Sequence, residues 1–213
     1  MKTAVIAGAS GLVGTQLLNK MLASMRYDKV IAVTRSPLQL DHPKLNNILA
    51  DFNDLAGALS GARPDDVFCC LGTTMAKAGS KKKFYEVDFE YPYSLAKITY
   101  GLGAKQYLLV SALGADKDSR IYYNRVKGEV EAAIRAIDFQ CIHIFRPSLL
   151  LGPRAEKRVG EDVAKKLYKI FGFLIPEKYQ AVPAEKVADA MLASASGNQT
   201  GVFIHESVEI QKF

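Results

Sequence analysis

The sequence predicts a doubly wound parallel α/β sheet, folded as a single compact domain over residues 1–213 with a small C-terminal extension. Short β-branched runs alternate with longer segments of helical periodicity, which is typical of parallel sheets crossed by helices. The runs around Val67 and Ile142 are apolar on both faces, as strands covered by helices on both sides are. Neither a repeat, a low-complexity tract nor a long linker divides the chain, which favours one domain.

The individual elements follow from these runs in chain order. Each expected strand is a short β-branched and apolar run, and the strands are placed at 3–7, 30–34, 47–50, 66–71, 106–110, 140–145 and 201–205. The longer segments between them predict helices at 12–25, 55–59, 85–100, 122–137, 160–171 and 186–195.

The composition is that of an ordinary globular protein, with 49% hydrophobic and 23% charged residues. No apolar run reaches the ~18 residues that a membrane-spanning helix needs, so no membrane partner is expected. The first residues enter a strand directly, without the apolar stretch or cleavage site of a secretory signal, which predicts a cytoplasmic location.

The net charge of +6 comes from scattered basic residues, and 81–83 is the one basic run. Such an excess favours solubility or a phosphorylated ligand over nucleic acid as a partner. The cysteines Cys69, Cys70 and Cys141 are expected to be free thiols, because neither their number nor their spacing fits a disulfide framework or a zinc site. The scattered histidines likewise give no support to a metal site, and His143, in an apolar run, is expected in the core.

A glycine-rich turn, GASGLVG at residues 8–14, separates the first strand from the first helix. Gly8 permits a sharp turn off the strand, Gly11 permits close approach of the backbone to a pyrophosphate, and Gly14 permits close packing of the helix. The pyrophosphate would bind at the positive end of the helix. This pattern predicts a Rossmann-type dinucleotide site whose contacts come from Gly8, Ser10, Gly11, Leu12, Val13 and Gly14.

The end of the second strand predicts which dinucleotide binds. Arg35 stands where NAD-binding domains usually place an acid for the ribose 2′-hydroxyl, and its guanidinium suits a 2′-phosphate. NADP(H) is therefore expected in preference to NAD(H), with a solvated surface arginine as the alternative. Asp51 and Phe52, after the third strand, are placed near the adenine, although an aspartate there is often a helix cap.

Two tyrosines have a lysine four residues later, Tyr93 with Lys97 and Tyr123 with Lys127. On a helix this spacing puts both side chains on one face, where the ammonium lowers the pKa of the phenol and makes it a better acid–base catalyst. Carbonyl reduction also needs a hydroxyl that holds the substrate oxygen. The second pair has one in Ser111, at the end of an expected strand, and the alternative is a surface pair on an amphipathic helix.

These features together resemble the short-chain dehydrogenase/reductase superfamily, in its atypical branch with a GxxGxxG turn. The segments CLGTT (70–74), GEVE (128–131) and FRP (145–147) are most similar to the Tat-interactive protein group of that branch. The resemblance implies an active-site triad of Ser111, Tyr123 and Lys127. It also implies that the cofactor cleft is lined by Leu71, Gly72, Thr73, Tyr123, Lys127 and Pro147.

Two departures from the family pattern affect the expected chemistry. The family often has an asparagine that holds a proton-relay water, and Asp88 stands at the similar position. The region after Pro147 is short beside the substrate lobe of sugar-nucleotide epimerases, which argues against a large nucleotide-linked substrate. Arg154, Lys157 and Arg158 could recognise an anionic substrate or form a solvated charged loop.

Two functions are predicted. The first is an NADP(H)-dependent oxidoreductase that reduces a small carbonyl substrate or oxidises the alcohol, with Tyr123 as proton donor. The second is an NADP(H)-binding regulatory or assembly protein without turnover, for which a protein partner or a homodimer is left open. The intact triad favours the enzyme.

Overall fold

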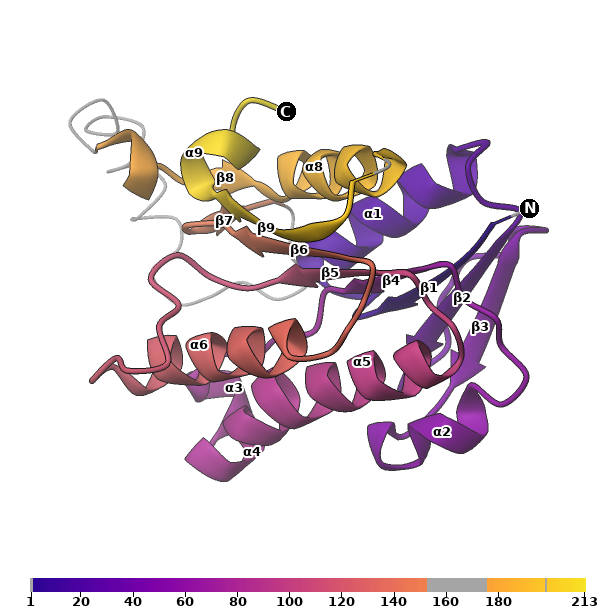
Figure 1. The fold of residues 1–213 in the computed structure, drawn as a ribbon, viewed down its shortest axis with the longest axis horizontal. Helices are drawn as coiled ribbons and strands as arrows, with labels where there is room; N and C mark the ends of the chain where they lie inside the picture. Colours follow the sequence, from indigo (N-terminus) through magenta and orange to yellow (C-terminus); the bar gives the residue numbers. More distant parts are fainter. Residues whose placement is uncertain (1, 153–175, 198) are drawn as a thin grey trace.

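A seven-stranded parallel sheet forms the centre of the computed structural model, which describes residues 2–152, 176–197 and 199–213 (Figure 1). The strand order is β3-β2-β1-β4-β5-β6-β9. The strands are β1 (Thr3–Ala7), β2 (Lys29–Thr34), β3 (Leu45–Leu49), β4 (Asp66–Cys69), β5 (Gln106–Val110), β6 (Cys141–Arg146) and β9 (Gly201–Glu206). Two short strands, β7 (Leu150–Leu151) and β8 (Val182–Pro183), pair separately. The predicted doubly wound parallel sheet is therefore confirmed.

Helices cover both faces of this sheet (Figure 1). One face carries α1 (Leu12–Ala23) and α8 (Ala184–Ser196), which pack against each other. The other carries α2 (Leu55–Ala58), α5 (Tyr91–Gly101) and α6 (Tyr122–Arg135). Alternate residues of the central strands enter the two apolar cores, because successive side chains of a strand point to opposite faces.

The remaining helical segments are short. They are the 3-10 turns η1 (Phe52–Asp54) and η4 (Glu177–Tyr179), the helices α3 (Met75–Ala78), α4 (Lys81–Tyr85) and α9 (Ser207–Ile210), and the π-helical segment η2 (Glu86–Glu90). The single helix expected at 85–100 is thus η2 followed by α5. The helix expected at 160–171 lies outside the described residues. None of the helices in the described part of the chain is long and apolar enough to cross a membrane.

The strand register gathers several loops at one edge of the sheet. Ala7, the last residue of β1, pairs with Val33 of β2 on one side and with Cys69 of β4 on the other. Cys69 in turn pairs with Leu109 near the end of β5. The chain order reverses between β1 and β4, and such a switch point is where doubly wound sheets bind ligands.

Candidate active site

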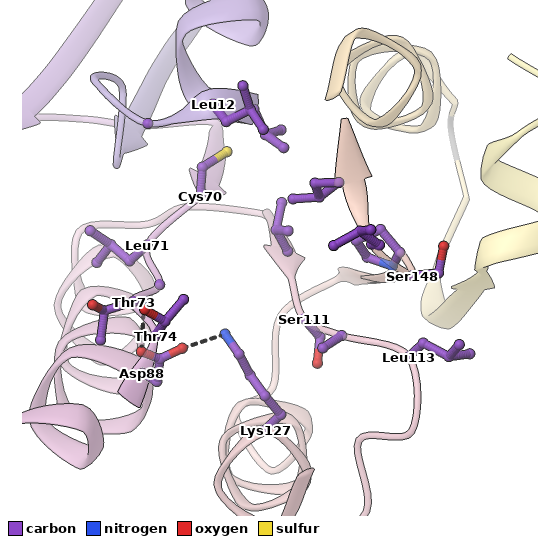
Figure 2. A pocket seen from close by; sticks show the side chains of 18 of the residues that line it. Leu12, Cys70, Leu71, Thr73, Thr74, Asp88, Ser111, Leu113, Lys127 and Ser148 are labelled. Carbon is purple, nitrogen blue, oxygen red and sulfur yellow. Dashed lines mark hydrogen bonds and ion pairs between the residues drawn. The ribbon is translucent and has the colours of Figure 1, made fainter. Parts of the chain in front are cut away.

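A cleft of about 1170 Å³ opens at this edge, where the loops after β1, β4, β5 and β6 meet (Figure 2). Most of the predicted site residues line it, namely Ser10, Gly11, Leu12, Val13, Leu71, Gly72, Thr73, Ser111, Tyr123, Lys127 and Pro147. The structure therefore brings the glycine-rich turn and the predicted triad into one cavity, although they lie about one hundred residues apart in the chain.

The three glycines of the turn are needed for different reasons, two for close backbone contacts and one for space in the cleft. Gly8 has φ +84°, a conformation that favours glycine, and a Cβ there would lie 2.6 Å from the carbonyl carbon of Cys70. A Cβ on Gly14 would lie 2.0 Å from the carbonyl oxygen of Gly8. Among the described residues a Cβ on Gly11 would meet that oxygen alone, at 3.2 Å. Gly8 and Gly14 are thus required by the fold, whereas Gly11 keeps space free in the cleft.

Helix α1 begins directly after Gly11, and no side chain in the described parts of the chain caps it. Its first turn also lacks acidic residues. The first N–H groups of a helix have no partner within the helix, and together with the helix dipole they favour an anion. The uncapped N-terminus and the space at Gly11 fit the pyrophosphate of a dinucleotide.

The residues predicted to contact the adenosine half lie outside the cleft lining. Arg35 directly follows β2, is exposed, and has no hydrogen bond or ion pair among the described residues. The pairing of Ala7 with Val33 puts this arginine beside the glycine-rich turn. Asp51 is exposed, whereas Phe52 is buried and its ring stacks on Tyr91 at 4.9 Å. Phe52 is therefore a core residue, and its contact with adenine stays a prediction.

Lys127 is buried in the floor of the cleft and pairs with Asp88 of η2 (Figure 2). The lysine Nζ lies 2.7 Å from Asp88 Oδ1, and the side chains are 5% and 0% exposed. Burial alone would lower the pKa of Lys127, but the carboxylate of Asp88, together with Tyr123 and Cys69, outweighs it, and the pKa is raised above its ordinary value. The second carboxylate oxygen of Asp88 accepts the backbone N–H of Thr73 at 2.8 Å.

Tyr123 lies one helical turn before Lys127 on α6 and is half-buried. Its ring packs on Phe84 of α4, with the ring centroids 5.6 Å apart. The proximity of Tyr123 is among the factors that raise the pKa of Lys127. Residues four apart on a helix share a face, and both Tyr123 and Lys127 line the cleft.

Ser111, directly after β5, donates its hydroxyl to Glu131 Oε1 at 2.5 Å. Glu131 is fully buried on α6 and is held by the guanidinium of Arg146, with an N–O distance of 2.6 Å. Glu131 raises the pKa of Arg146, which also pairs with Glu206 of β9 at 3.0 Å. The site serine is thus linked through two charged side chains to the last strand of the sheet.

Sequence reasoning did not give Glu131 and Arg146 a role, although both stand in motifs of the family resemblance. A signal for Glu131 was present, because it follows Lys127 by four residues on the buried face of an amphipathic helix. A carboxylate at such a position needs a partner. The position of that partner at the end of β6 follows from the fold alone.

The other pair of tyrosine and lysine, Tyr93 and Lys97, lies on α5 outside the cleft. Tyr93 lies on α5 and packs against Phe89, with the ring centroids 5.8 Å apart. The ammonium of Lys97 lies over the Tyr93 ring, 5.4 Å from its centroid, and is exposed. Neither residue lines the cleft. Arg154, Lys157 and Arg158 lie outside the described residues.

The fold and this cleft define a class of dinucleotide-binding proteins, and sequence comparison identifies the family. The chain belongs to the NAD(P)H-binding family, whose model matches residues 8–197. The rat Protein HTATIP2 is 39% identical over 198 residues, which cover 90% of this chain and 80% of that protein. The mitochondrial Protein FMP52 of Candida glabrata is 36% identical over 172 residues, which cover 80% and 74% of the two chains.

Solved structures share the fold. A short-chain dehydrogenase/reductase-family oxidoreductase from Burkholderia thailandensis superposes with a TM-score of 0.75 at 17% identity, covering 100% of this chain and 93% of that one. The Bordetella bronchiseptica enzyme WbmH in complex with NAD⁺ gives 0.74 at 14% identity, covering 97% and 76%. The resemblance to the Tat-interactive protein group is confirmed by the match to HTATIP2, and the Rossmann-type dinucleotide-binding fold is confirmed by the family match and these structures.

Proposed function

We propose that this protein is an NADP(H)-dependent oxidoreductase that interconverts a small carbonyl compound and its alcohol, with Ser111, Tyr123 and Lys127 as its active site. One observation carries the proposal: a single cleft contains both an uncapped helix N-terminus with room for a pyrophosphate and a tyrosine beside a buried, charged lysine. The first feature suits a dinucleotide and the second suits proton transfer.

The bound dinucleotide would supply the hydride that adds to the carbonyl carbon. Tyr123 donates its phenolic proton to the substrate oxygen, and water then returns a proton to the phenolate. Lys127 stabilises that phenolate by its charge, and it would hold the nicotinamide ribose of the bound dinucleotide. Ser111 orients the substrate oxygen, for which its hydroxyl has to turn from Glu131 toward the cleft.

The wall of the cleft beyond the triad supports a substrate with an apolar body. The described side chains lining this part are mainly apolar or aromatic, namely Met75, Leu113, Leu149, Leu150 and Tyr179. Leu149 and Tyr179 are more than half exposed although they are large and apolar. Covering them with a ligand is favourable, so the substrate is an aldehyde or ketone with a small alkyl or aryl group.

The preference for NADP(H) rests on Arg35. Its side chain is exposed beside the glycine-rich turn, where a 2′-phosphate on the adenosine ribose could reach it. The guanidinium would pair with that phosphate through two charge-assisted hydrogen bonds. Residues 1–213 are proposed as one such domain, since its sheet includes strands from both ends of the chain. The cytoplasmic location stays a prediction, because fungal relatives are named mitochondrial.

The second candidate, a dinucleotide-binding regulatory protein without turnover, is favoured by one observation. Both Lys127 and Ser111 have partners inside the protein, Asp88 and Glu131, at 2.7 Å and 2.5 Å. Groups held in this way could serve to support the cleft alone. In such a protein, binding of a dinucleotide would change its affinity for a protein partner or for a second copy of itself.

Replacing Tyr123 by phenylalanine separates the two candidates, because it removes the phenolic oxygen and keeps the ring on Phe84. NADPH oxidation with a panel of apolar aldehydes and ketones should fall about 10²–10⁴-fold, which is the usual contribution of acid–base catalysis. Tyr93→Phe, at the pair outside the cleft, should retain wild-type turnover. Full activity of Tyr123→Phe would refute the proposed role. A wild type that binds NADPH and reduces no compound of the panel would favour the regulatory candidate over the enzyme.

A further inference from the structure

We propose that Asp88 is a positioning residue that keeps Lys127 charged and fixes it to the loop after β4. The inference rests on the proposed function only where it concerns turnover. Its physical basis is the direct contact of two fully or almost fully buried side chains (Figure 2).

The contact leaves no place for a relay water between these two groups. Asp88 Oδ1 and Lys127 Nζ are 2.7 Å apart, which is the distance of a direct ion pair. The other oxygen holds the backbone N–H of Thr73, which lines the cleft. One carboxylate therefore fixes both the lysine and the loop that faces the cofactor.

The local backbone explains how the aspartate reaches the lysine. Asp88 lies at the centre of η2, where five residues adopt a π-helical conformation between α4 and α5. A π-helical insertion rotates the following side chains relative to a regular helix, and such insertions are frequent at functional sites. Asp88 is fully buried, whereas Glu90, two residues later in the same segment, is exposed.

Without a partner, a buried ammonium tends to lose its proton. The ionisable groups that face Lys127 are Asp88 from η2, Tyr123 from its own helix and the thiol of Cys69 from β4. The Cys69 thiol is fully buried, and burial raises its pKa, so that it stays neutral. Asp88 is thus the group that supplies a negative charge, and the charge of Lys127 depends on it.

The first experiment needs no cofactor. The side-chain ammonium of Lys127 is followed by NMR in protein with isotope-labelled lysine, from pH 6 to pH 10. In the wild type Lys127 should stay charged across this range, whereas in Asp88→Asn it should lose its proton within the range, because a buried ammonium without a partner is disfavoured. Glu90→Gln removes the same charge from an exposed position and should match the wild type.

Two results would overturn the proposal. One is a wild-type protein in which Lys127 loses its proton within this pH range, as a buried lysine without a partner would. This result needs no variant. The other is an Asp88→Asn variant in which Lys127 keeps its charge over the same range.

The second experiment measures NADPH affinity against pH. Asp88→Asn should bind within about threefold of the wild type at pH 6 and lose about tenfold or more once its lysine is neutral. Adding Lys127→Arg should remove this pH dependence, because arginine stays charged at every accessible pH. A purely structural Asp88 would give the same loss at all pH values, with no rescue. If the wild type binds no dinucleotide, the proposed function fails, while the NMR titration still decides the role of Asp88.

Discussion

Two buried aspartates, Asp66 and Asp88, differ in their surroundings: the first lies away from the cleft and the second pairs with a residue that lines it. Asp66 begins β4 and accepts the hydroxyl of Tyr27 at 2.7 Å and the guanidinium of Arg26 at 3.1 Å. Its region has no part in the lining of the cleft. Asp88 pairs with Lys127, which lines the cleft. Both carboxylates are fully buried, so burial of a charge does not by itself distinguish a structural group from a functional one.

The difference lies in what the partners of each aspartate can reach. The partners of Asp66 lie outside the cleft lining: Tyr27 is fully buried, and Arg26 also donates to the carbonyl of Ala195. The ammonium of Lys2, 3.7 Å from Asp66 Oδ2, is partly exposed but does not line the cleft either. Lys127 has a carboxylate on one side and the cleft on the other. We therefore expect changes near Asp66 to alter stability and changes around the cleft to alter binding and turnover.

The largest effect is expected for Asp66→Asn. Removing one member of a buried charged cluster leaves the rest without compensation and typically costs about 3–5 kcal/mol. The free energy of unfolding, measured with urea, should fall by about that amount, while NADPH affinity of the folded protein stays unchanged. Asp118→Asn, in an exposed loop, is the control with the same change of charge. A large loss of NADPH affinity in Asp66→Asn would break the comparison.

Arg35→Ala should have the opposite effect, lowering the affinity for NADP(H) and leaving stability unchanged. Losing a charge-assisted pair costs about 1.5–3 kcal/mol, so affinity for NADP(H) should fall about tenfold to a hundredfold. Affinity for NAD(H) and the urea midpoint should change little, because Arg35 is exposed. Isothermal titration with both cofactors checks this. Equal losses for both would show that Arg35 does not distinguish them.

The region of Asp66 extends to a histidine pair, and this predicts a pH dependence of stability. Cys141, near Asp66, contacts His143, and His143 Nδ1 lies 3.0 Å from His205 Nε2. Burial and the neighbouring His205 lower the pKa of His143 to about 4. The folded state thus resists a proton that the unfolded state binds below pH ~6.5, so stability present above that pH is lost as the pH falls toward 4.

The free energy of unfolding should fall by about 2 kcal/mol between these pH values. This is less than the full shift of the His143 pKa implies, because His205 is half-buried and water screens its interaction with His143. Urea unfolding at pH 7 and pH 4.5 measures it. The pH dependence should flatten in His143→Gln and persist in His42→Gln, which lies outside the pair. Stability that is equal at both pH values in the wild type would contradict this prediction.

The smallest expected effect is the coupling between the two aspartates. Among the described residues they share no partner, and the stability changes of independent sites usually add within about 0.5 kcal/mol. The double variant of Asp66→Asn and Asp88→Asn should therefore lose the sum of the two single losses. A larger deviation in urea unfolding would mean that the two regions are linked through β4.

The regular part of the fold could be predicted from sequence because it depends on local patterns. The central strands need apolar residues on both faces, and this limits their positions to within one or two residues. The glycines at 8, 11 and 14 indicated the turn, since each permits a backbone position that a Cβ would obstruct. Ser111 after β5 separated Tyr123 from Tyr93, and the structure places only the former in the cleft.

The buried charges could not be predicted in the same way. Asp66 stands at the start of a strand, and in sequence such an aspartate looks like an ordinary residue of the preceding loop. The side chains that donate to it, Arg26 and Tyr27, lie about forty residues earlier in the chain. The π-helical geometry of η2 leaves no periodic signal in five residues, so the direction of Asp88 was not evident. Glu131 and Arg146 meet across α6 and β6, a contact that depends on how the helix packs on the sheet.

The different roles of the three turn glycines have a consequence for how this sequence can change over generations. Under selection for folding alone, Gly8 and Gly14 would remain fixed, because a Cβ at either one enters backbone. Gly11 would drift to serine or asparagine, which are good residues for the start of a helix. A mutational library sorted first for abundance and then for dinucleotide binding would lose this diversity at Gly11 only in the second step. Constraint at that one position thus reports whether descendants of this chain still bind the ligand.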